Sequence, residues 1–219
     1  MHSSIKNYED IVKSIKSKLE GQKRNKFPKI IAVTKTFALE NILPLIEYGH
    51  LDYGENKVQE AIEKWTETKN KNPEIKLHLI GRLQTNKVKF AIKLFDYIHS
   101  VDSVKLAKKI FDEQNNQNKK VKIFIQVNIG SEEQKSGVTI DKTGELLNFC
   151  KELKLDVIGL MCIPPANQKP NKYFEKMNIL KNILNLPELS MGMSSDYLEA
   201  VINNTTYLRI GSSIFGKRY

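Results

Sequence analysis

The sequence predicts an α/β protein, a (β/α)8 barrel of eight parallel strands with an extra helix before the first strand. Short apolar runs alternate with amphipathic stretches along almost the whole chain. Each run and the stretch after it take about 25 residues, and eight such units fit the usual length of a barrel. Several runs are continuously apolar, which is typical of strands that are buried on both faces.

The chain opens on a helical segment, Ser4–Leu19, in which apolar residues recur every three or four positions. A break over Gly21–Pro28 separates it from the first strand. The predicted strands are Lys29–Thr34, Leu51–Gly54, Lys76–Ile80, Tyr97–Val101, Val121–Asn128, Leu155–Met161, Glu188–Met191 and Tyr207–Ile210. The predicted helices between them are Leu39–Tyr48, Val58–Thr68, Asn86–Leu94, Val104–Gln114, Thr143–Lys151, Tyr173–Leu184 and Ser195–Asn203.

An open, doubly wound sheet would also alternate strands with helices. The first strand is followed by no glycine-rich dinucleotide fingerprint, which counts against that alternative. We therefore expect a closed barrel that forms a single domain over residues 1–219. The most loop-like stretch is Gly130–Gly137, which we interpret as a candidate lid.

The composition argues against several classes of protein. No apolar run approaches the ~20 residues of a membrane span. The N-terminal segment is charged and lacks the apolar core of a secretory signal. The two cysteines, Cys150 and Cys162, have neither metal-like nor redox-like spacing, and the histidines are scattered. We therefore expect a cytoplasmic protein with no metal site and no membrane partner.

The net charge of +10 raises the possibility of a nucleic-acid partner. Lysines spread along the chain make up this excess, and the arginines are only Arg24, Arg82, Arg209 and Arg218. No basic block is interleaved with aromatic residues. This pattern favours a solvated, lysine-rich surface, so we expect no nucleic-acid partner.

Lys35 follows the apolar run Ile30–Thr34, at the point where a buried strand gives way to a loop. A lysine in that position has an apolar wall behind it and an open mouth in front. Partial desolvation disfavours the ammonium form, and the neutral amine is a nucleophile. The alternative is that Lys35 only ends the strand.

Serines and glycines follow the last two predicted strands, where barrels commonly bind phosphate. Gly192 allows a sharp turn before Ser194, and Gly211 and Ser212 follow the eighth strand. Their hydroxyl and N–H groups are the donors that a phosphate dianion requires. The alternative is ordinary helix capping by serine.

A ligand that carries both an aldehyde and a phosphate would use the lysine and both loops. Pyridoxal 5′-phosphate (PLP) is such a ligand. Arg209 precedes Gly211 by two residues and shares its strand face, so we expect it to point into the same mouth. Beside the pyridine nitrogen, its permanent charge would keep that nitrogen unprotonated. A buried ion pair is the alternative for Arg209. Asn56 either hydrogen-bonds the imine region or the phenolic oxygen of PLP, or caps the next helix.

The motifs at these strand ends resemble those of the pyridoxal phosphate homeostasis proteins. The matching segments are Ala32–Lys35, Tyr53–Asn56, Val58–Glu60, His78–Lys87, Val127–Ile129, Lys135–Val138, Gly159–Met161, Ser190–Ser194, Arg209–Gly211 and Ile214–Gly216. The resemblance implies a barrel like the N-terminal domain of alanine racemase, with PLP as an internal aldimine on Lys35. It also implies phosphate contacts from Ser194, Gly211 and Ser212, and Arg209 at the pyridine nitrogen.

The resemblance further implies control of free PLP and of amino-acid and keto-acid balance, without an assigned reaction. Two positions depart from the family pattern. Asn204 stands where glycine is common, and Cys162 stands where threonine is common. Asparagine tolerates a left-handed turn, whereas the cysteine would change the polarity beside the cofactor.

Three activities compete for this site. The first is a monomeric PLP carrier or buffer, which could deliver PLP to PLP-dependent apoenzymes. The second is an amino-acid racemase, which needs a second acid or base and a β domain; the chain ends at Tyr219, directly after the eighth unit. The third is a Schiff-base aldolase, which explains Lys35 and the loops but not Arg209. We expect the carrier, with no catalytic residue, and His78 as a core histidine.

Overall fold

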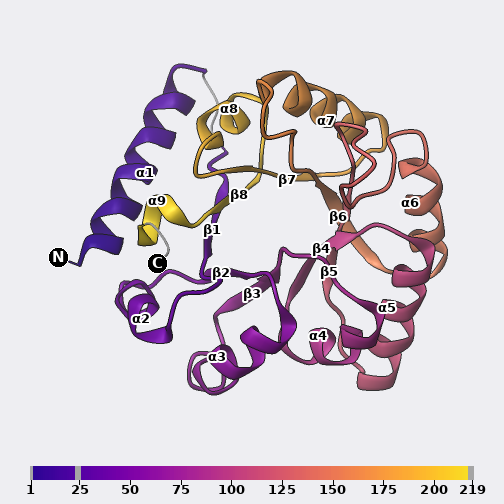
Figure 1. The fold of residues 1–219 in the computed structure, drawn as a ribbon, viewed down its shortest axis with the longest axis horizontal. Coiled ribbons are helices and arrows are strands. Elements are labelled where there is room, and N and C mark those ends of the chain that lie inside the picture. Colours follow the sequence, from indigo (N-terminus) through magenta and orange to yellow (C-terminus); the bar gives the residue numbers. More distant parts are fainter. Residues whose placement is uncertain (1, 23–25, 217–219) are drawn as a thin grey trace.

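In the computed structural model, eight parallel strands close into a barrel, and the strands follow their order in the sequence around it (Figure 1). The structure describes residues 2–22 and 26–216. The strands are β1 Lys29–Val33, β2 Asp52–Glu55, β3 Lys76–Leu79, β4 Tyr97–Val101, β5 Lys122–Gln126, β6 Asp156–Met161, β7 Glu188–Met193 and β8 Tyr207–Ile210. Every predicted strand is present, and the predicted barrel is confirmed.

The helices form a ring around the strands (Figure 1). They are α1 Ser3–Glu20, α2 Leu39–Glu47, α3 Val58–Lys71, α4 Val88–Leu94, α5 Val104–Gln117, α6 Thr143–Glu152, α7 Asn171–Ile183, α8 Tyr197–Ile202 and α9 Ser212–Phe215, with a 3-10 turn, η1, at Thr85–Lys87. The extra N-terminal helix α1 packs on the outside of the ring against α8 and α9, where the Asn7 amide donates to the Ile214 carbonyl at 2.9 Å.

Several element boundaries differ from the prediction by a few residues, and two of these differences and one additional helix have a clear physical reason. Helix α8 begins at Tyr197 rather than Ser195, because the Asp196 carboxylate accepts the Met193 N–H at 2.6 Å and holds a turn there. The 3-10 turn precedes α4, so the predicted helix is regular only from Val88. Helix α9 was not predicted, because four residues are too few to reveal a helical period.

The main apolar core lies between the strands and the surrounding helices, with Trp65 as its largest fully buried side chain. A smaller cluster made of Ile31, Tyr97, Phe124, Met161 and Tyr207 is buried separately. His78 stacks on Tyr97 and His99 stacks on Phe124, with ring centroids 4.2 Å and 4.3 Å apart, so polar rings share this second cluster. His78 is fully buried and hydrogen-bonded, which confirms its prediction as a core histidine.

Within the described ranges, no helix has both the length and the apolar character to cross a membrane.

Gly159 allows a close approach of β6 to β7. It pairs with Glu188, and a β-carbon added at Gly159 would lie 2.2 Å from the Glu188 carbonyl oxygen. Backbone cannot move aside as the end of a side chain can, so the sheet must shift. In helix α6, by contrast, a β-carbon added at Gly144 would meet nothing closer than 3.7 Å.

We expect Gly159→Ala to lower the free energy of unfolding by about 2 kcal/mol, the usual cost of overpacking. Gly144→Ala is the matched control and is expected to raise the free energy of unfolding by about 0.5 kcal/mol, because alanine favours a helix. Urea denaturation measures both values. Equal effects of the two substitutions would contradict the close approach of β6 to β7.

Candidate cofactor site

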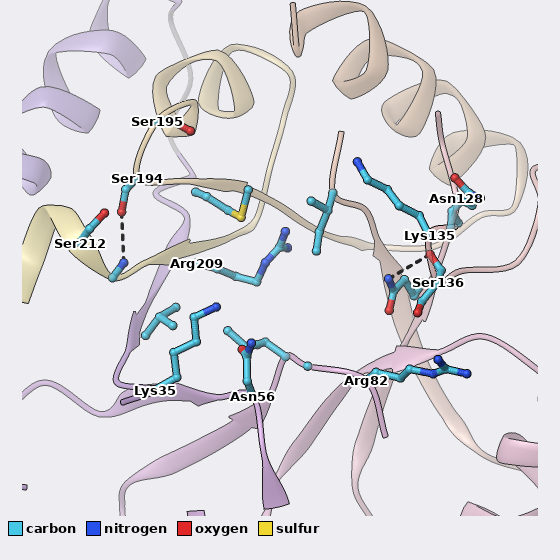
Figure 2. A pocket seen from close by; sticks show the side chains of 18 of the residues that line it. Lys35, Asn56, Arg82, Asn128, Lys135, Ser136, Ser194, Ser195, Arg209 and Ser212 are labelled. Atoms are coloured by element: carbon cyan, nitrogen blue, oxygen red, sulfur yellow. Dashed lines mark hydrogen bonds between the residues drawn. The ribbon is translucent and has the colours of Figure 1, made fainter. Parts of the chain in front are cut away.

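A cavity of about 600 Å³ opens at the end of the barrel where the strands finish (Figure 2). Its lining comes from the ends of all the strands except β4 and from the loops that follow them. A volume of this size is typical of small-molecule sites. All the residues selected from the sequence line this one cavity: Lys35, Asn56, Ser194, Arg209, Gly211 and Ser212.

Lys35 lies two residues beyond the end of β1, and its side chain points into the cavity (Figure 2). The next residue, Thr36, has a φ of 66°, in the left-handed region that a β-branched residue rarely adopts. The Thr36 N–H donates to Glu60 Oε1 at 2.6 Å, which compensates this strained turn. The turn redirects the chain directly after Lys35.

The residue before Lys35 is held from the same side. The Thr34 hydroxyl donates to Glu55 Oε1 at 2.7 Å, and the Lys64 ammonium donates to the Thr34 carbonyl at 2.8 Å. Lys64 also bridges the carboxylates of Glu55 and Glu60, at 2.9 Å and 3.0 Å. Glu55 is fully buried, so this ion pair is shielded from water. The network fixes the backbone on both sides of Lys35.

The Glu60 carboxylate remains ionised in this network. Desolvation acts to raise its pKa, but the Thr36 amide and the Lys64 ammonium together hold the pKa of Glu60 below its ordinary value. A charged acceptor makes a stronger hydrogen bond than a neutral one. The strained turn at Thr36 is therefore secured by a carboxylate over the whole neutral pH range.

The loops after β7 and β8 are joined through Ser194. Its Oγ accepts the N–H groups of Gly211 and Ser213, both at 3.3 Å. Gly192, with a φ of 93°, allows the turn, since a β-carbon there would lie 2.5 Å from the Ala200 β-carbon. The N-cap residues of α8 and α9 make no side-chain cap. Ser194 therefore does not cap the helix that follows it, as the alternative predicted, but binds the loop after β8. The same contacts gather N–H and O–H donors at one wall of the cavity.

Arg209 is buried, with 4% of its surface exposed, and it lines the cavity. Its Nη1 donates to the Ser190 hydroxyl at 2.7 Å and its Nη2 to the Cys162 carbonyl at 2.8 Å. Both acceptors are neutral, and the described part of the chain places no carboxylate in a salt bridge with this guanidinium. The predicted alternative, a buried ion pair, is therefore wrong.

Asn56 follows β2 and lines the cavity beside Lys35 (Figure 2). Helix α3 begins after Lys57 with no side-chain cap, so the capping alternative for Asn56 is wrong. Gly81 packs directly against it, since a β-carbon at Gly81 would lie 2.3 Å from the Asn56 carbonyl oxygen. This contact between the loops after β2 and β3 fixes the position of Asn56.

Comparison with known proteins identifies the family of this chain. The family model described as "Alanine racemase, N-terminal domain" matches residues 10–219. The pyridoxal phosphate homeostasis protein of Aquifex aeolicus is 38% identical over 200 residues, which cover 87% of each chain. That of Vibrio alginolyticus is 36% identical, covering 100% of this chain and 99% of the relative. The chain belongs to the pyridoxal phosphate homeostasis protein family.

Solved structures agree with this family. PipY of Synechococcus elongatus, solved without PLP, has a TM-score of 0.83 and 32% identity, covering 92% of this chain and 100% of PipY. PipY with PLP bound has a TM-score of 0.79 and 31% identity over the same shares of the two chains. An alanine racemase of Clostridium difficile, 15% identical with a TM-score of 0.76, shares the fold over 99% of this chain and 57% of its own.

The two departures from the family pattern now have a structural account. Asn204 has a φ of 65°, so the left-handed turn expected of it is present. Cys162 is fully buried and is not part of the cavity wall, although its carbonyl holds Arg209. Burial raises the pKa of its thiol to about 12. The sulfur therefore does not change the polarity of the cavity.

The wall opposite Lys35 was not predicted from the sequence. The candidate lid Gly130–Gly137 contributes Gln134, Lys135 and Ser136 to this wall. The Lys135 amine is paired with Glu132 at 2.6 Å and with the Pro164 carbonyl at 3.2 Å. A strand-end amide, Asn128, binds the Glu132 backbone and ties this loop to β5. The motifs were visible in the sequence, but nothing in their spacing indicated that they face Lys35.

Both cysteines should be unreactive in the folded protein. Cys150 and Cys162 are free and buried, and burial raises the pKa of each thiol to about 12. We expect no reaction of the native protein with Ellman's reagent at pH 8, and reaction of both thiols once the chain is unfolded. Rapid labelling of native Cys162 would contradict its burial behind the cavity wall.

Proposed function

We propose that this protein binds PLP, with the Lys35 amine joined to the PLP aldehyde, and that it acts in PLP homeostasis as an intracellular carrier or buffer. The observation that carries the proposal is the meeting of three kinds of group in one cavity: an amine, a wall of phosphate donors and a buried guanidinium. PLP would supply a reactive aldehyde. The chain would supply attachment, orientation and electrostatics, from Lys35, Asn56, Ser194, Arg209, Gly211 and Ser212.

The donors around Ser194 suit the phosphate end of PLP. The N–H groups of Gly211 and Ser213 already converge on one oxygen, Ser194 Oγ. A phosphate oxygen would accept such donors more strongly, because it is charged. Ser212 adds a hydroxyl at the same wall (Figure 2). This end of the cavity therefore fits a dianion.

Arg209 suits the ring nitrogen of PLP. A permanent positive charge beside that nitrogen opposes its protonation, and a guanidinium donates hydrogen bonds but accepts none. An unprotonated pyridine nitrogen is an acceptor, so the two groups are complementary. Among the residues described, no carboxylate forms a salt bridge with Arg209, and its two hydrogen-bond acceptors are neutral. The positive charge is therefore available to a group in the cavity. Such a ring withdraws electrons weakly, which suits storage better than turnover.

The cavity lining supports a carrier over a racemase. The ionisable side chains that line it, within the described ranges, are all basic: Lys35, Arg82, Lys135 and Arg209. Racemisation needs an acid or base on each face of the ring. Lys135 is already paired with Glu132 and the Pro164 carbonyl. The printed name of the relatives, and PipY with PLP bound, point the same way.

The remaining features of the proposal follow from this role. We propose that the chain acts as a monomer, as a single PLP-binding domain over residues 1–219, in the cytoplasm. Both cysteines are free thiols, which suits a reducing compartment. The recipients of the cofactor would be PLP-dependent apoenzymes, since those are the proteins that require a supply of PLP.

The first test is the visible absorption of the protein after incubation with PLP. We expect a yellow protein whose band is abolished by borohydride, because reduction removes the double bond between the lysine and the aldehyde carbon. Lys35→Ala should lose the band, whereas Lys57→Ala, an exposed lysine near Asn56, should retain it. An unchanged band in Lys35→Ala would refute the assignment of the attachment residue.

The second test addresses turnover. We expect negligible racemisation of alanine by the PLP-loaded protein, measured by circular dichroism. Among the described residues, the cavity lining has no acidic side chain, and Lys135 is already paired with Glu132. Turnover at an ordinary enzymatic rate, about 1 s⁻¹ or faster, would contradict the carrier role. A colourless protein that binds a sugar phosphate instead would favour an aldolase.

A further inference from the structure

A chain of hydrogen bonds crosses the interior of the barrel, from the cavity to the opposite end. Arg209 Nη1 lies 2.7 Å from Ser190 Oγ, which lies 2.8 Å from His99 Nδ1. His99 Nε2 lies 3.0 Å from His78 Nδ1, and His78 Nε2 lies 2.9 Å from Asp52 Oδ1. These five residues come from five different strands, and they use no backbone groups to connect to one another.

The two ends of this chain fix the direction of its first and last hydrogen bonds. Arginine only donates, and an ionised aspartate only accepts. Desolvation acts to raise the pKa of Asp52, but the hydrogen bond from His78 and the charge of Lys29 hold it below its ordinary value. With Asp52 ionised and both buried rings neutral, each step donates toward Asp52, from Arg209 through Ser190, His99 and His78.

This direction requires one state of each imidazole. Each neutral ring carries its proton on Nε2, which donates, and accepts on Nδ1. Burial lowers the pKa of His78, although Asp52 opposes the shift, and burial lowers the pKa of His99 well below its ordinary value. A proton added to Nδ1 of His78 would face the Nε2–H of His99 across the 3.0 Å contact between the rings. A proton added to Nδ1 of His99 would face the hydroxyl proton of Ser190 instead.

Other ionisable groups around the rings do not interrupt the chain. Lys29 Nζ lies 3.8 Å from Asp52 Oδ1 and adds positive charge at the Asp52 end of the chain of hydrogen bonds. Among the described residues, Tyr97 and Tyr207 also contact the two rings, and Asp96 and His50 interact electrostatically with His78. The charge of Asp96 raises the pKa of His78 only slightly, whereas burial lowers it more strongly. Neutral rings therefore remain favoured.

We propose that Ser190, His99, His78 and Asp52 form a positioning relay that fixes the guanidinium of Arg209 at the cofactor cavity. The relay supplies one of the two hydrogen bonds that hold the guanidinium, and the Cys162 carbonyl supplies the other. Two bonds in different directions fix a planar group, whereas one leaves it free to turn. The role at the pyridine nitrogen rests on the proposed function, but the relay itself does not.

The decisive comparison is Ser190→Ala against Ser100→Ala. Both serines are buried, with 0% and 1% of their surface exposed, and both changes remove only a hydroxyl. Ser100 is next to His99 on β4, so its side chain points to the opposite face of the strand. Among the residues described, its hydroxyl has no hydrogen-bond partner. Only Ser190→Ala breaks the relay.

The first readout uses the cofactor-free protein and nitrogen-15 NMR. In the wild type at pH 7 we expect both rings to be neutral and protonated at Nε2. The guanidinium protons of Arg209 should be resolved and slow to exchange in the wild type and in Ser100→Ala, and averaged in Ser190→Ala. A ring protonated at Nδ1, or an equally ordered Arg209 in Ser190→Ala, overturns the relay. The wild-type measurement decides even if Ser190→Ala does not fold.

The second readout is PLP binding. We expect Ser190→Ala to raise the dissociation constant of PLP about tenfold, the loss of one hydrogen bond from a charged group, and to shift the visible band. Ser100→Ala should bind as the wild type does. Equal binding by both variants overturns the relay while leaving the proposed function intact. A wild type that binds no PLP refutes the proposed function, and the NMR readout still decides the relay.

Discussion

The pairing of β8 with β1 closes the barrel, and the candidate site depends on it. Ile31 pairs with Arg209 and Ala32 with Ile210, so the ends of the two strands lie side by side. A β-carbon at Gly211 would lie 3.1 Å from the Val33 carbonyl oxygen, so a glycine allows this close approach. The pairing brings Lys35, near one end of the chain, into the same cavity as Arg209 and Ser212, near the other.

Lys35 and Arg209, the two central residues of the site, are positioned in different ways. Lys35 is flanked by backbone that carboxylates and an ammonium secure, through Glu55, Glu60 and Lys64. Arg209 is held by neutral oxygens, which leave its charge directed at the cavity. An ion pair would have neutralised that charge. Acidic groups therefore secure the backbone beside Lys35, and the positive charge of Arg209 lines the cavity.

The sequence allowed the strands and the main site residues to be predicted, because two general rules were enough. Apolar runs identified the strands, and the preference of barrels for sites at strand ends selected Lys35, Ser194 and Gly211. The contacts that hold these residues escaped prediction. Glu60 and Lys64 are four residues apart on a helix, so their pairing was foreseeable, but the contact of Glu60 with the Thr36 amide depends on a left-handed turn that threonine rarely adopts. His99 on β4 and Ser190 on β7 are on strands that do not pair, so they meet only in the closed barrel.

The central claim is that Lys35 is the residue that holds PLP. Peptide mapping by mass spectrometry tests it directly, after the PLP-loaded protein has been reduced with borohydride and digested. The account predicts one phosphopyridoxyl group per chain, on the peptide that contains Lys35. Modification at another lysine with Lys35 unmodified, or no modification in a protein that has taken up PLP, would contradict it.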